Sequence, residues 1–449
     1  MLTRCAKRFV NVIKTKGIIE ALTRVIRRVA AVLLALIIIL IWPFKKIRLI
    51  RLISSRIGHY AQNTHMLLCA LKYNTFPEEK NCVHFYYIQT HVPVCNVFLH
   101  KMWSRVIRIL PSWGAFWGHV DYLLRITLRK RYQTPFKKRF EDFVGALDMF
   151  GYCRKDRNQF LSFSKEEETM GEELKIKLGI PADKLFVCLL VRDTAYTKTI
   201  FPDSVWDNEN FRHADIKSYI PAIEFLIQNG FYVVRMGKLV ENALDIGDAR
   251  LIDYANHPVK SDFMDIYLSA HCFFFISTPC GLDDVPRIFN RPTVATNAIL
   301  FQEKCYTPWT FLIPKNIMSM KTQVLVSYQE QYQDYKHFIL SGKYTNLRDP
   351  IMEAWKRKGW FFIDNTPDEL LAVVKEALDY MTHSVTETFE IKDLQLQFWK
   401  SYPTELPSAE ASYENVIMRI SPYFLKKHYN LLNQSMDEIY CEAEITQNV

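Results

Sequence analysis

The chain has 449 residues, of which 49% are hydrophobic, 14% aromatic and 23% charged. These values exclude a disordered, collagen-like or low-complexity chain, and the length is sufficient for two or three domains with their own cores. The net charge of +9 is unevenly distributed: residues 1–56 carry 13 Lys and Arg against the single acidic residue Glu20, whereas the other 44 Lys and Arg face 47 Asp and Glu. A nearly neutral globular part with a basic N-terminal segment gives no indication of nucleic acid as a partner.

The ten cysteines are scattered, without a C-x-x-C pair or a Cys/His spacing typical of zinc sites. Several lie in apolar runs, as Cys188 and Cys272 do, where cysteine acts as a small hydrophobic residue. A chain of this length needs no disulfides for stability. We therefore expect free thiols and the reducing cytosol as the compartment.

An uncharged apolar run at residues 29–44 lies between Arg27-Arg28 and Lys45-Lys46. As a helix it would extend roughly 24 Å, which is less than the ~30 Å hydrocarbon core of a bilayer. Basic residues flank the run on both sides, so a spanning helix would carry one basic flank across the membrane. We expect residues 1–46 to form a basic amphipathic segment and hydrophobic anchor on the anionic, cytoplasmic face of the cell membrane, with Trp42 at its interfacial end. The anchor is monotopic, re-entrant or single-pass; a core helix is the alternative, which the two basic clusters disfavour.

The first part of the globular region alternates strand and helix patterns. Strand patterns occur at residues 47–53, 83–88 and 106–110, with helical patterns between them. Alternation of this kind indicates parallel strands joined by crossover helices. A charged stretch at 164–182 interrupts the alternation and is predicted to be a linker.

The alternation then resumes over a second region. Residues 185–191 form a continuous apolar run, as in strands that are buried on both faces. The sequence therefore predicts an α/β protein with two Rossmann-like domains facing a cleft, an N-terminal domain for the acceptor at 47–163 and a C-terminal domain for the donor at 183–385. A helical segment and tail follow at 386–449.

Several catalytic motifs are absent from the sequence. It contains no G-x-G-x-x-G, G-x-x-x-x-G-K-[ST], H-E-x-x-H or G-x-S-x-G motif, so dinucleotide oxidoreductases, P-loop enzymes, zincins and α/β-hydrolases lose their usual signatures. Asp-x-Asp, the metal-chelating spacing of divalent-dependent nucleotide-sugar enzymes, is absent as well. We expect neither a metal nor a cofactor.

Polar residues follow the expected strands at four places. They are Arg192-Asp193, Arg235 to Gly237 and Ser277 to Gly281 in the second domain, and Arg56 to His59 in the first. Ligands of open α/β sheets bind outside the carboxyl ends of strands. Taken singly, each residue has an ordinary role as an ion-pair partner or a turn residue. Cys280 is far more typical of a structural cysteine than of a nucleophile, since the nearest histidine along the chain precedes its strand.

Taken together, these residues match the needs of a metal-free diphosphate site. Arg makes bidentate contacts with phosphate, and small residues at a helix N-terminus offer free amides. We expect this role from Arg192, Arg235, Thr278 and Gly281. Across the cleft, His59 and Arg56 are the expected catalytic residues, His59 either as the general base for the acceptor hydroxyl or as a residue that orients the acceptor.

At these residues the sequence resembles an uncharacterised family of bacterial glycosyltransferases with the two-Rossmann GT-B architecture. The resemblance covers roughly residues 47–432 and excludes the basic anchor. The matching segments are Arg56-Ile57-Gly58-His59, Val191-Arg192-Asp193, Arg235-Met236-Gly237, Ile252-Asp253-Tyr254, Ser261-Asp262-Phe263, Gly281-Leu282-Asp283, Val285-Pro286 and Ile420-Ser421-Pro422. The loop Thr278-Pro279-Cys280 departs from the small-residue loop of the family. The resemblance implies nucleotide-sugar-dependent transfer in cell-surface polysaccharide biosynthesis, with Gly58 in the acceptor-side loop. It also implies that Asp193, Gly237, Asp262, Leu282 and Asp283 belong to the donor-binding residues.

The sequence thus predicts a membrane-associated, metal-independent glycosyltransferase. It would move a sugar from a nucleotide-sugar donor to a cell-surface glycan or lipid-linked acceptor, while Arg192 and Arg235 stabilise charge on the departing diphosphate. Two other classes stay open: a non-catalytic GT-B-fold binding or scaffold protein at the membrane, and a nucleotide-sugar epimerase of similar fold. Nucleotide binding distinguishes an enzyme from the scaffold protein. The identity of the product distinguishes a glycosyltransferase from the epimerase.

Overall fold

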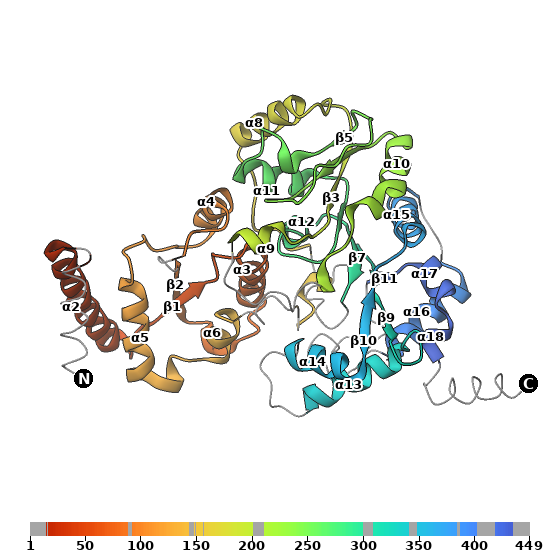
Figure 1. Cartoon of the computed structure of the whole chain (residues 1–449). Helices are drawn as coiled ribbons and strands as arrows, with labels where there is room; N and C mark the ends of the chain where they lie inside the picture. The colour runs from red at the N-terminus through yellow and green to blue at the C-terminus, as the bar shows by residue number, and fades with distance from the viewer. Residues whose placement is uncertain are drawn as a thin grey trace, which may run out of the picture. The chain divides into compact units, whose positions relative to one another are not determined.

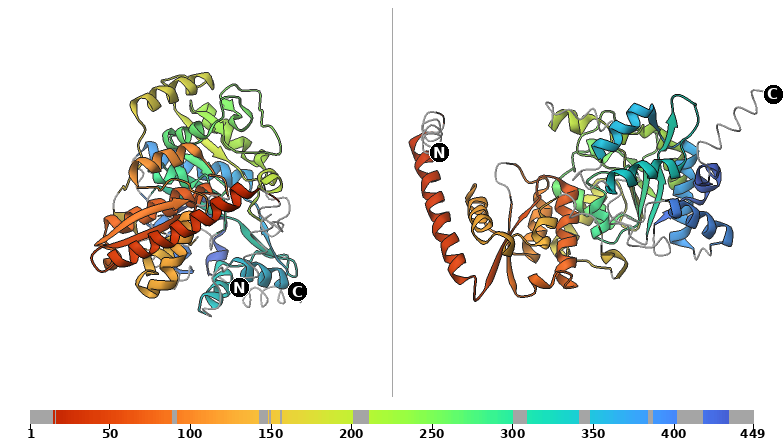
Figure 2. Two further views of the ribbon diagram at one scale, coloured as in Figure 1. Left: turned by 90° about the vertical axis from the view of Figure 1, so that its left-hand side faces the viewer. Right: turned by 90° about the horizontal axis from the view of Figure 1, so that it is seen from below.

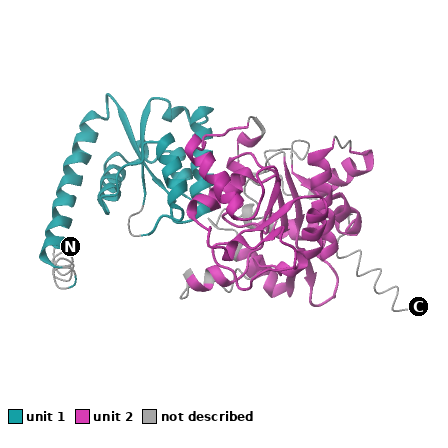
Figure 3. Ribbon diagram, turned by 90° about the horizontal axis from the view of Figure 1, so that it is seen from above, with its two compact units in different colours: residues 1–146 teal, residues 147–449 magenta. Residues whose placement is uncertain are grey.

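The chain divides into two compact units, residues 1–146 and 147–449 (Figure 3). The computed structural model describes residues 15, 17–88, 92–142, 148, 150–155, 157–200, 211–299, 309–340, 348–383, 387–401 and 418–433. Most of the basic segment before Gly17 and the tail after Asn433 therefore lie outside the described residues.

Unit 1 is built around two parallel strands, β1 (Lys46–Leu52) and β2 (Cys82–Ile88), joined by α3 (Ile57–Lys72) (Figure 1). The predicted third strand at 106–110 contributes a single bridge, between Ile109 and Tyr86, among the residues that the structure describes. The first residue of the predicted strand, Val106, is instead the last residue of helix α4. The other helical elements are α2 (Ile18–Ile41), η1 (Pro77–Glu79), α4 (Val97–Val106), α5 (Phe116–Leu128), η2 (Arg129–Arg131) and α6 (Pro135–Phe140).

Helix α2 contains the predicted apolar run and packs against α5. Its buried stripe includes two small residues, Ala31 and Ala35, in a cluster with Val120 and Leu124 of α5. Trp42, expected at a membrane interface, is instead buried in the core of unit 1, with its ring centroid 5.7 Å from that of Tyr132. Within the described residues, we find no helix with the length and apolar character needed to span a bilayer.

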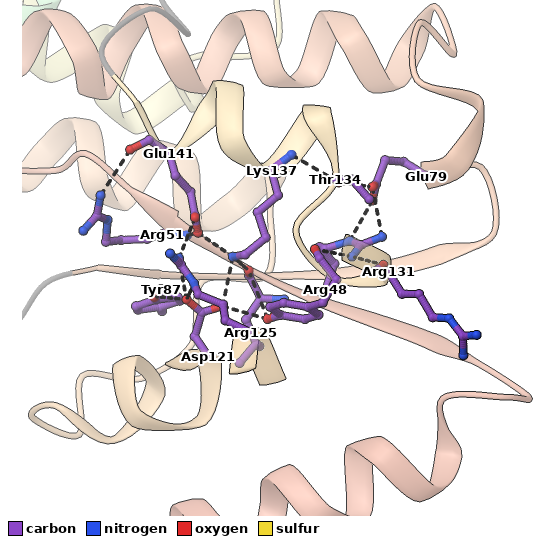
Figure 4. Close-up of polar contacts among 12 residues, drawn as sticks. Arg48, Arg51, Glu79, Tyr87, Asp121, Arg125, Arg131, Thr134, Lys137 and Glu141 are labelled. Atoms are coloured by element: carbon purple, nitrogen blue, oxygen red, sulfur yellow. Dashed lines mark hydrogen bonds and ion pairs between the residues drawn. The ribbon is translucent and has the colours of Figure 1, made fainter. Parts of the chain in front are cut away.

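A buried ionic network ties β1, α5 and α6 together (Figure 4). Lys137 is fully buried, and its Nζ atom lies 2.9 Å from Asp121 Oδ1 and 2.5 Å from Glu141 Oε1. Arg125 Nη2 lies 2.6 Å from a carboxylate oxygen of each of the same two acids. Charges removed from water need such complete pairing, so the network fixes the relative positions of the three elements.

Unit 2 contains a seven-stranded sheet in the order β11-β8-β7-β6-β3-β4-β5. Every strand pair in it is parallel, as the alternating pattern predicted. The strands are β3 (Phe186–Leu190), β4 (Tyr232–Arg235), β5 (Leu251–Ile252), β6 (Phe275–Ser277), β7 (Thr293–Ala298), β8 (Thr310–Pro314) and β11 (Arg419–Ile420). A separate antiparallel pair is formed by β9 (Asn316–Ser319) and β10 (Trp360–Ile363).

Helices cover both faces of this sheet. On one face, Val187 and Leu189 of β3 join a core with α10 (Ile220–Gln228) and α15 (Pro367–Thr382). On the other, the Cys188 thiol donates to the Leu268 carbonyl of α11 (Asp262–His271), at 3.6 Å. The remaining helical elements are α7 (Tyr152–Lys155), α8 (Lys165–Lys177), α9 (Ala195–Ile200), η5 (Ile216–Tyr219), η6 (Tyr254–Asn256), α11 (Asp262–His271), α12 (Asp284–Ile288), α13 (Tyr328–Leu340), α14 (Arg348–Lys358), α16 (Phe389–Ser401), α17 (Pro422–Lys427) and α18 (Asn430–Asn433).

The charged segment 164–182, predicted to be a linker, forms helix α8 and lies within unit 2. Ser164 and Glu167 form a reciprocal capping box at its start. A Cβ atom on Gly171 would lie 2.1 Å from the ring of Tyr267, so the glycine permits close packing on α11. The Tyr267 hydroxyl also donates to Glu172 at 2.8 Å. High charge here marks a solvated helix face and not an irregular connection.

Candidate functional site

The site lies where the strand order of unit 2 reverses. From β3 the chain proceeds to β4 and β5 on one side, and then returns to β6, β7 and β8 on the other. Arg192 follows β3 after one residue, and Thr278 follows β6 directly. The Arg192 amide donates to Thr278 Oγ1 at 2.7 Å, and the Thr278 amide donates to the Leu190 carbonyl at 3.0 Å. The two segments thus meet at the place where open parallel sheets bind ligands.

Asp193 organises the loop after β3 through backbone contacts. Its two carboxylate oxygens accept from the amides of Ala195 at 3.0 Å and Glu241 at 2.9 Å. The Glu241 carboxylate in turn accepts from the Thr194 hydroxyl. Asp193 therefore joins the loop after β3 to the loop after β4, a positioning role that differs from the expected contact with the donor.

Three basic residues near this edge were not predicted from the sequence. Arg212 donates to the Pro279 carbonyl at 2.7 Å, and Lys315 donates to the His213 carbonyl at 2.7 Å. Burial, followed by the positive charges of Arg192 and Lys315, lowers the pKa of His213 to about 4. A neutral imidazole with Nε2 buried and without a hydrogen-bond partner among the described residues thus lies beside the Arg192 segment.

Arg235 has a structural role instead of the predicted diphosphate contact. It is only 1% exposed, and its Nη1 atom donates to Asp253 Oδ1 and to the Asn242 carbonyl, each at 2.9 Å. A Cβ atom on Gly237 would lie 2.7 Å from Val240 Cγ1, which explains the glycine in this loop. The matched segment Arg235 to Gly237 therefore shapes the loop after β4, and its guanidinium is held inside the fold.

The segment after β6 is also directed largely inward. The Asp283 carboxylate is buried, accepts from Ser277 at 3.2 Å and pairs with Arg287 at 3.2 Å. Burial, together with the Asp283 charge, raises the pKa of Cys280 to about 12, which agrees with a structural thiol. Gly281 and Leu282 are partly buried. The helix that follows, α12, has only five residues. Its dipole therefore contributes less to anion binding at Gly281 than the sequence led us to expect.

Asp262 is the first residue of α11, directly after the helix cap. Ser261 caps the helix by accepting from the Met264 amide at 3.2 Å. Asp262 is partly buried. In the sheet order, β5, which precedes α11 in the chain, is separated from β3 by β4.

In unit 1, the predicted catalytic residues lie at the start of α3. Arg56 is the exposed N-cap residue, and Gly58 and His59 are buried in the first turn. His59 Nδ1 lies 3.1 Å from Asn63 Oδ1, and Asn63 Nδ2 donates to the Asp142 carbonyl at 2.7 Å. An amide oxygen accepts only, so this contact assigns the proton to Nδ1 and makes Nε2 the basic nitrogen.

The described residues contain no group of three or more His, Cys, Asp or Glu side chains placed to hold a metal ion. The structure forms no disulfide bond among the cysteines that it describes.

No protein-family model matches the sequence, and no curated protein matches it. Among solved structures, the chain is similar to Escherichia coli ADP-heptose lipopolysaccharide heptosyltransferase II, with 14% identity over 56% of this chain and 84% of that chain, and a TM-score of 0.30. It is similar to a family 9 glycosyl transferase from Veillonella parvula, with 10% identity over 74% and 97% of the two chains and a TM-score of 0.37. A third similar structure is an iron-containing dodecameric glycosyltransferase from enterotoxigenic E. coli, with 14% identity over 59% and 63% and a TM-score of 0.31. These likenesses are partial, and no activity follows from them for this chain.

Proposed function

We propose that the chain is a nucleotide-sugar-dependent glycosyltransferase whose donor diphosphate binds at the carboxyl ends of β3 and β6. The observation that carries the proposal is the 2.7 Å contact between the Arg192 amide and Thr278 Oγ1, which joins the two strand ends at the reversal of strand order. Arg192 brings a permanently charged guanidinium to this edge, and a guanidinium matches the geometry of phosphate oxygens. The sequence resemblance described above points to the same donor class.

We assign a separate role to one residue of each unit. The acceptor oxygen forms a bond to the anomeric carbon of the sugar, and the bond from that carbon to the diphosphate oxygen breaks. Arg192 stabilises the negative charge that develops on the leaving diphosphate. His59, with Nε2 as its basic nitrogen, takes the proton from the acceptor hydroxyl. We propose that the transfer needs no metal, so chelation with EDTA is expected to leave the rate unchanged.

We place the enzyme at the cytoplasmic face of the cell membrane, with a cell-surface glycan or lipid-linked sugar as its acceptor. The support is the apolar run of α2 between basic residues at both of its ends. Such a location matches an acceptor that is itself held in the membrane.

The decisive experiment measures nucleotide binding and then product formation. Saturation-transfer NMR with ADP, UDP, GDP and CMP compounds is expected to show binding by the full chain and its loss in Arg192→Ala. Arg250→Ala is the matched control, because Arg250 precedes β5 and pairs with Asp248 at the opposite edge of the sheet, at 2.6 Å. If neither the wild type nor Arg250→Ala binds a nucleotide, the non-catalytic scaffold protein is the class that remains. A labelled donor that is isomerised without transfer would establish the epimerase class.

A further inference from the structure

The strongest unassigned surface is the outer side of α2, which runs along one side of unit 1 (Figure 2). Between Val29 and Phe44 every exposed side chain is apolar, and several of them are at least half exposed. Exposed fractions reach 57% for Leu33, 51% for Ile37, 74% for Leu40 and 90% for Phe44. Contiguous apolar surface of this extent is unusual on a soluble monomer and marks a contact surface.

The inner side of the same helix belongs to the core of unit 1. Ala31, Ala35, Ile38 and Trp42 are buried in a cluster with residues of β1, β2 and α5. One side of α2 is therefore occupied by protein, so lipid cannot surround the helix. A helix with one side on protein and an apolar opposite side meets a membrane in the plane of its surface.

Basic residues stand at both ends of this surface. Arg27 and Arg28 are exposed before it, and Lys45 and Lys46 are exposed after it. The Arg27 guanidinium lies against Gly114, where a Cβ atom would be 2.9 Å from Nη1, beside the exposed Trp113. Helix α5 adds the exposed apolar residues Tyr122 and Ile126. An apolar strip with cations at its ends is complementary to acyl chains and anionic headgroups.

We infer that α2 and α5 form a lipid-docking layer that lies in the plane of an anionic membrane, and that α2 is an integral part of unit 1 and not a detachable anchor. The occupant is a bilayer surface and not a second copy of the chain, because a symmetric pair of these surfaces would bring like-charged ends together without a counter-charge. The inference rests on the proposed membrane location and is independent of the transferase chemistry.

The test compares the purified full chain with variants in vesicle flotation. Leu33→Glu/Leu40→Glu places two charges on the outer side of α2. The matched control, Met170→Glu/Ile176→Glu, places two charges at exposed apolar positions of helix α8, where exposed fractions are 40% and 53%. Vesicles of phosphatidylcholine alone are compared with vesicles that also contain phosphatidylserine, at low and high salt.

The wild type and the α8 control are expected to float with phosphatidylserine vesicles, more strongly at low salt, and the α2 variant to bind at least about tenfold more weakly. Retained binding in a folded α2 variant would overturn the inference. So would a wild type that ignores both vesicles and forms a dimer that the α2 variant abolishes. Nucleotide binding by the same variant is expected to equal that of the wild type, so failure of the lipid result is distinguishable from failure of the proposed enzyme.

The second part of the inference is tested at the inner side. Ala35→Leu is expected to lower the melting temperature of the full chain, because Ala35 is only 2% exposed against α5. Leu36→Ala, at the neighbouring exposed position, is the control and is expected to leave the melting temperature unchanged. Equal melting temperatures for wild type, Ala35→Leu and Leu36→Ala would show that α2 is a detachable segment.

Discussion

The Nζ atom of Lys137 lies 2.9 Å from Oδ1 of Asp121 in the interior of unit 1 (Figure 4). The same ammonium group contacts Glu141, whose other oxygen reaches Arg125. Although burial opposes ionisation, the charges of Lys137 and Arg125 lower the pKa of Asp121. Two acids and two bases thus neutralise one another where β1, α5 and α6 meet. The network also extends toward the candidate residue His59, because Glu141 is followed by Asp142, whose carbonyl accepts from Asn63 beside His59.

Replacement of Lys137 by Met is expected to destabilise unit 1 severely. The change removes one of the two cations that pair with the buried Asp121 and Glu141, and breaking a buried pair typically costs about 3–5 kcal/mol. The midpoint of urea unfolding measures the loss. Lys138→Met is the control, since Lys138 is exposed at the next position of α6. Equal midpoints for the two variants would contradict a structural role of the network.

The lowered pKa of Glu79 is expected to make the stability of unit 1 depend on pH in the acid range. Burial alone would raise its pKa, but hydrogen bonds from His84 and Thr134 and the charge of Arg48 lower the pKa to about 2. A depressed pKa contributes stability that is present above the unfolded value of about 4.3 and is lost as the pH falls toward 2. We expect the melting temperature of the wild type to fall between about pH 5 and pH 2 and that of Glu79→Gln to fall less steeply. Parallel curves would contradict the assignment.

Arg235→Met is expected to lower stability by about 3 kcal/mol, because it leaves the Asp253 carboxylate without its cation. In contrast to Arg192, Arg235 is held inside the fold, so nucleotide affinity is expected to change less than in Arg192→Ala. A double-mutant cycle with Asp253→Asn measures the pair directly, and we expect a coupling energy of about 0.5–3 kcal/mol. A coupling energy near zero, together with strongly weakened nucleotide binding by Arg235→Met, would instead support a contact between Arg235 and the donor.

Arg192→Ala is expected to weaken nucleotide binding by about ten- to hundred-fold, the loss of a charge-assisted hydrogen bond of about 1.5–3 kcal/mol. Titration followed by NMR measures the change, with Arg250→Ala as the control. Unfolding is not expected, since the contact with Thr278 is made by the Arg192 backbone amide, which the substitution keeps. Unchanged affinity in a folded Arg192→Ala would falsify the donor site.

Sequence reasoning succeeded where a local pattern has one physical solution. The apolar run at 185–191 predicted buried strand β3. The rule that ligands bind at the carboxyl ends of strands selected Arg192 and Thr278, and the structure brings these two residues together. The rule would also have found Lys315, which directly follows β8, but that strand was not identified.

Where the structure differs from the expectations drawn from the sequence, the difference depends on contacts between distant parts of the chain. Apolar character alone does not separate protein from lipid, so Trp42 was assigned to an interface although Tyr132 buries it. The partner of Arg235 is Asp253, on a neighbouring strand end that only the folded sheet brings close. His213 follows a stretch with no strand or helix period, and its neutral state depends on burial and on Arg192.

His59 is expected to serve the acceptor and not the donor. The 3.1 Å contact of Nδ1 with Asn63 leaves Nε2 as the proton acceptor, so His59→Asn is expected to lower turnover by about 10²–10⁴-fold while nucleotide binding stays near the wild-type value. Asn keeps some hydrogen bonding and removes the titratable group, which separates the base from a residue that only orients the acceptor.

A pH–rate profile of the wild type is expected to show a limb that disappears in His59→Asn. Asn63→Ala provides the intermediate case, because it frees the imidazole from its fixed tautomer without removing the base, and a partial loss of turnover with a shifted limb is expected. Full turnover in His59→Asn, or loss of nucleotide binding in its place, would show that the first turn of α3 has no part in proton transfer.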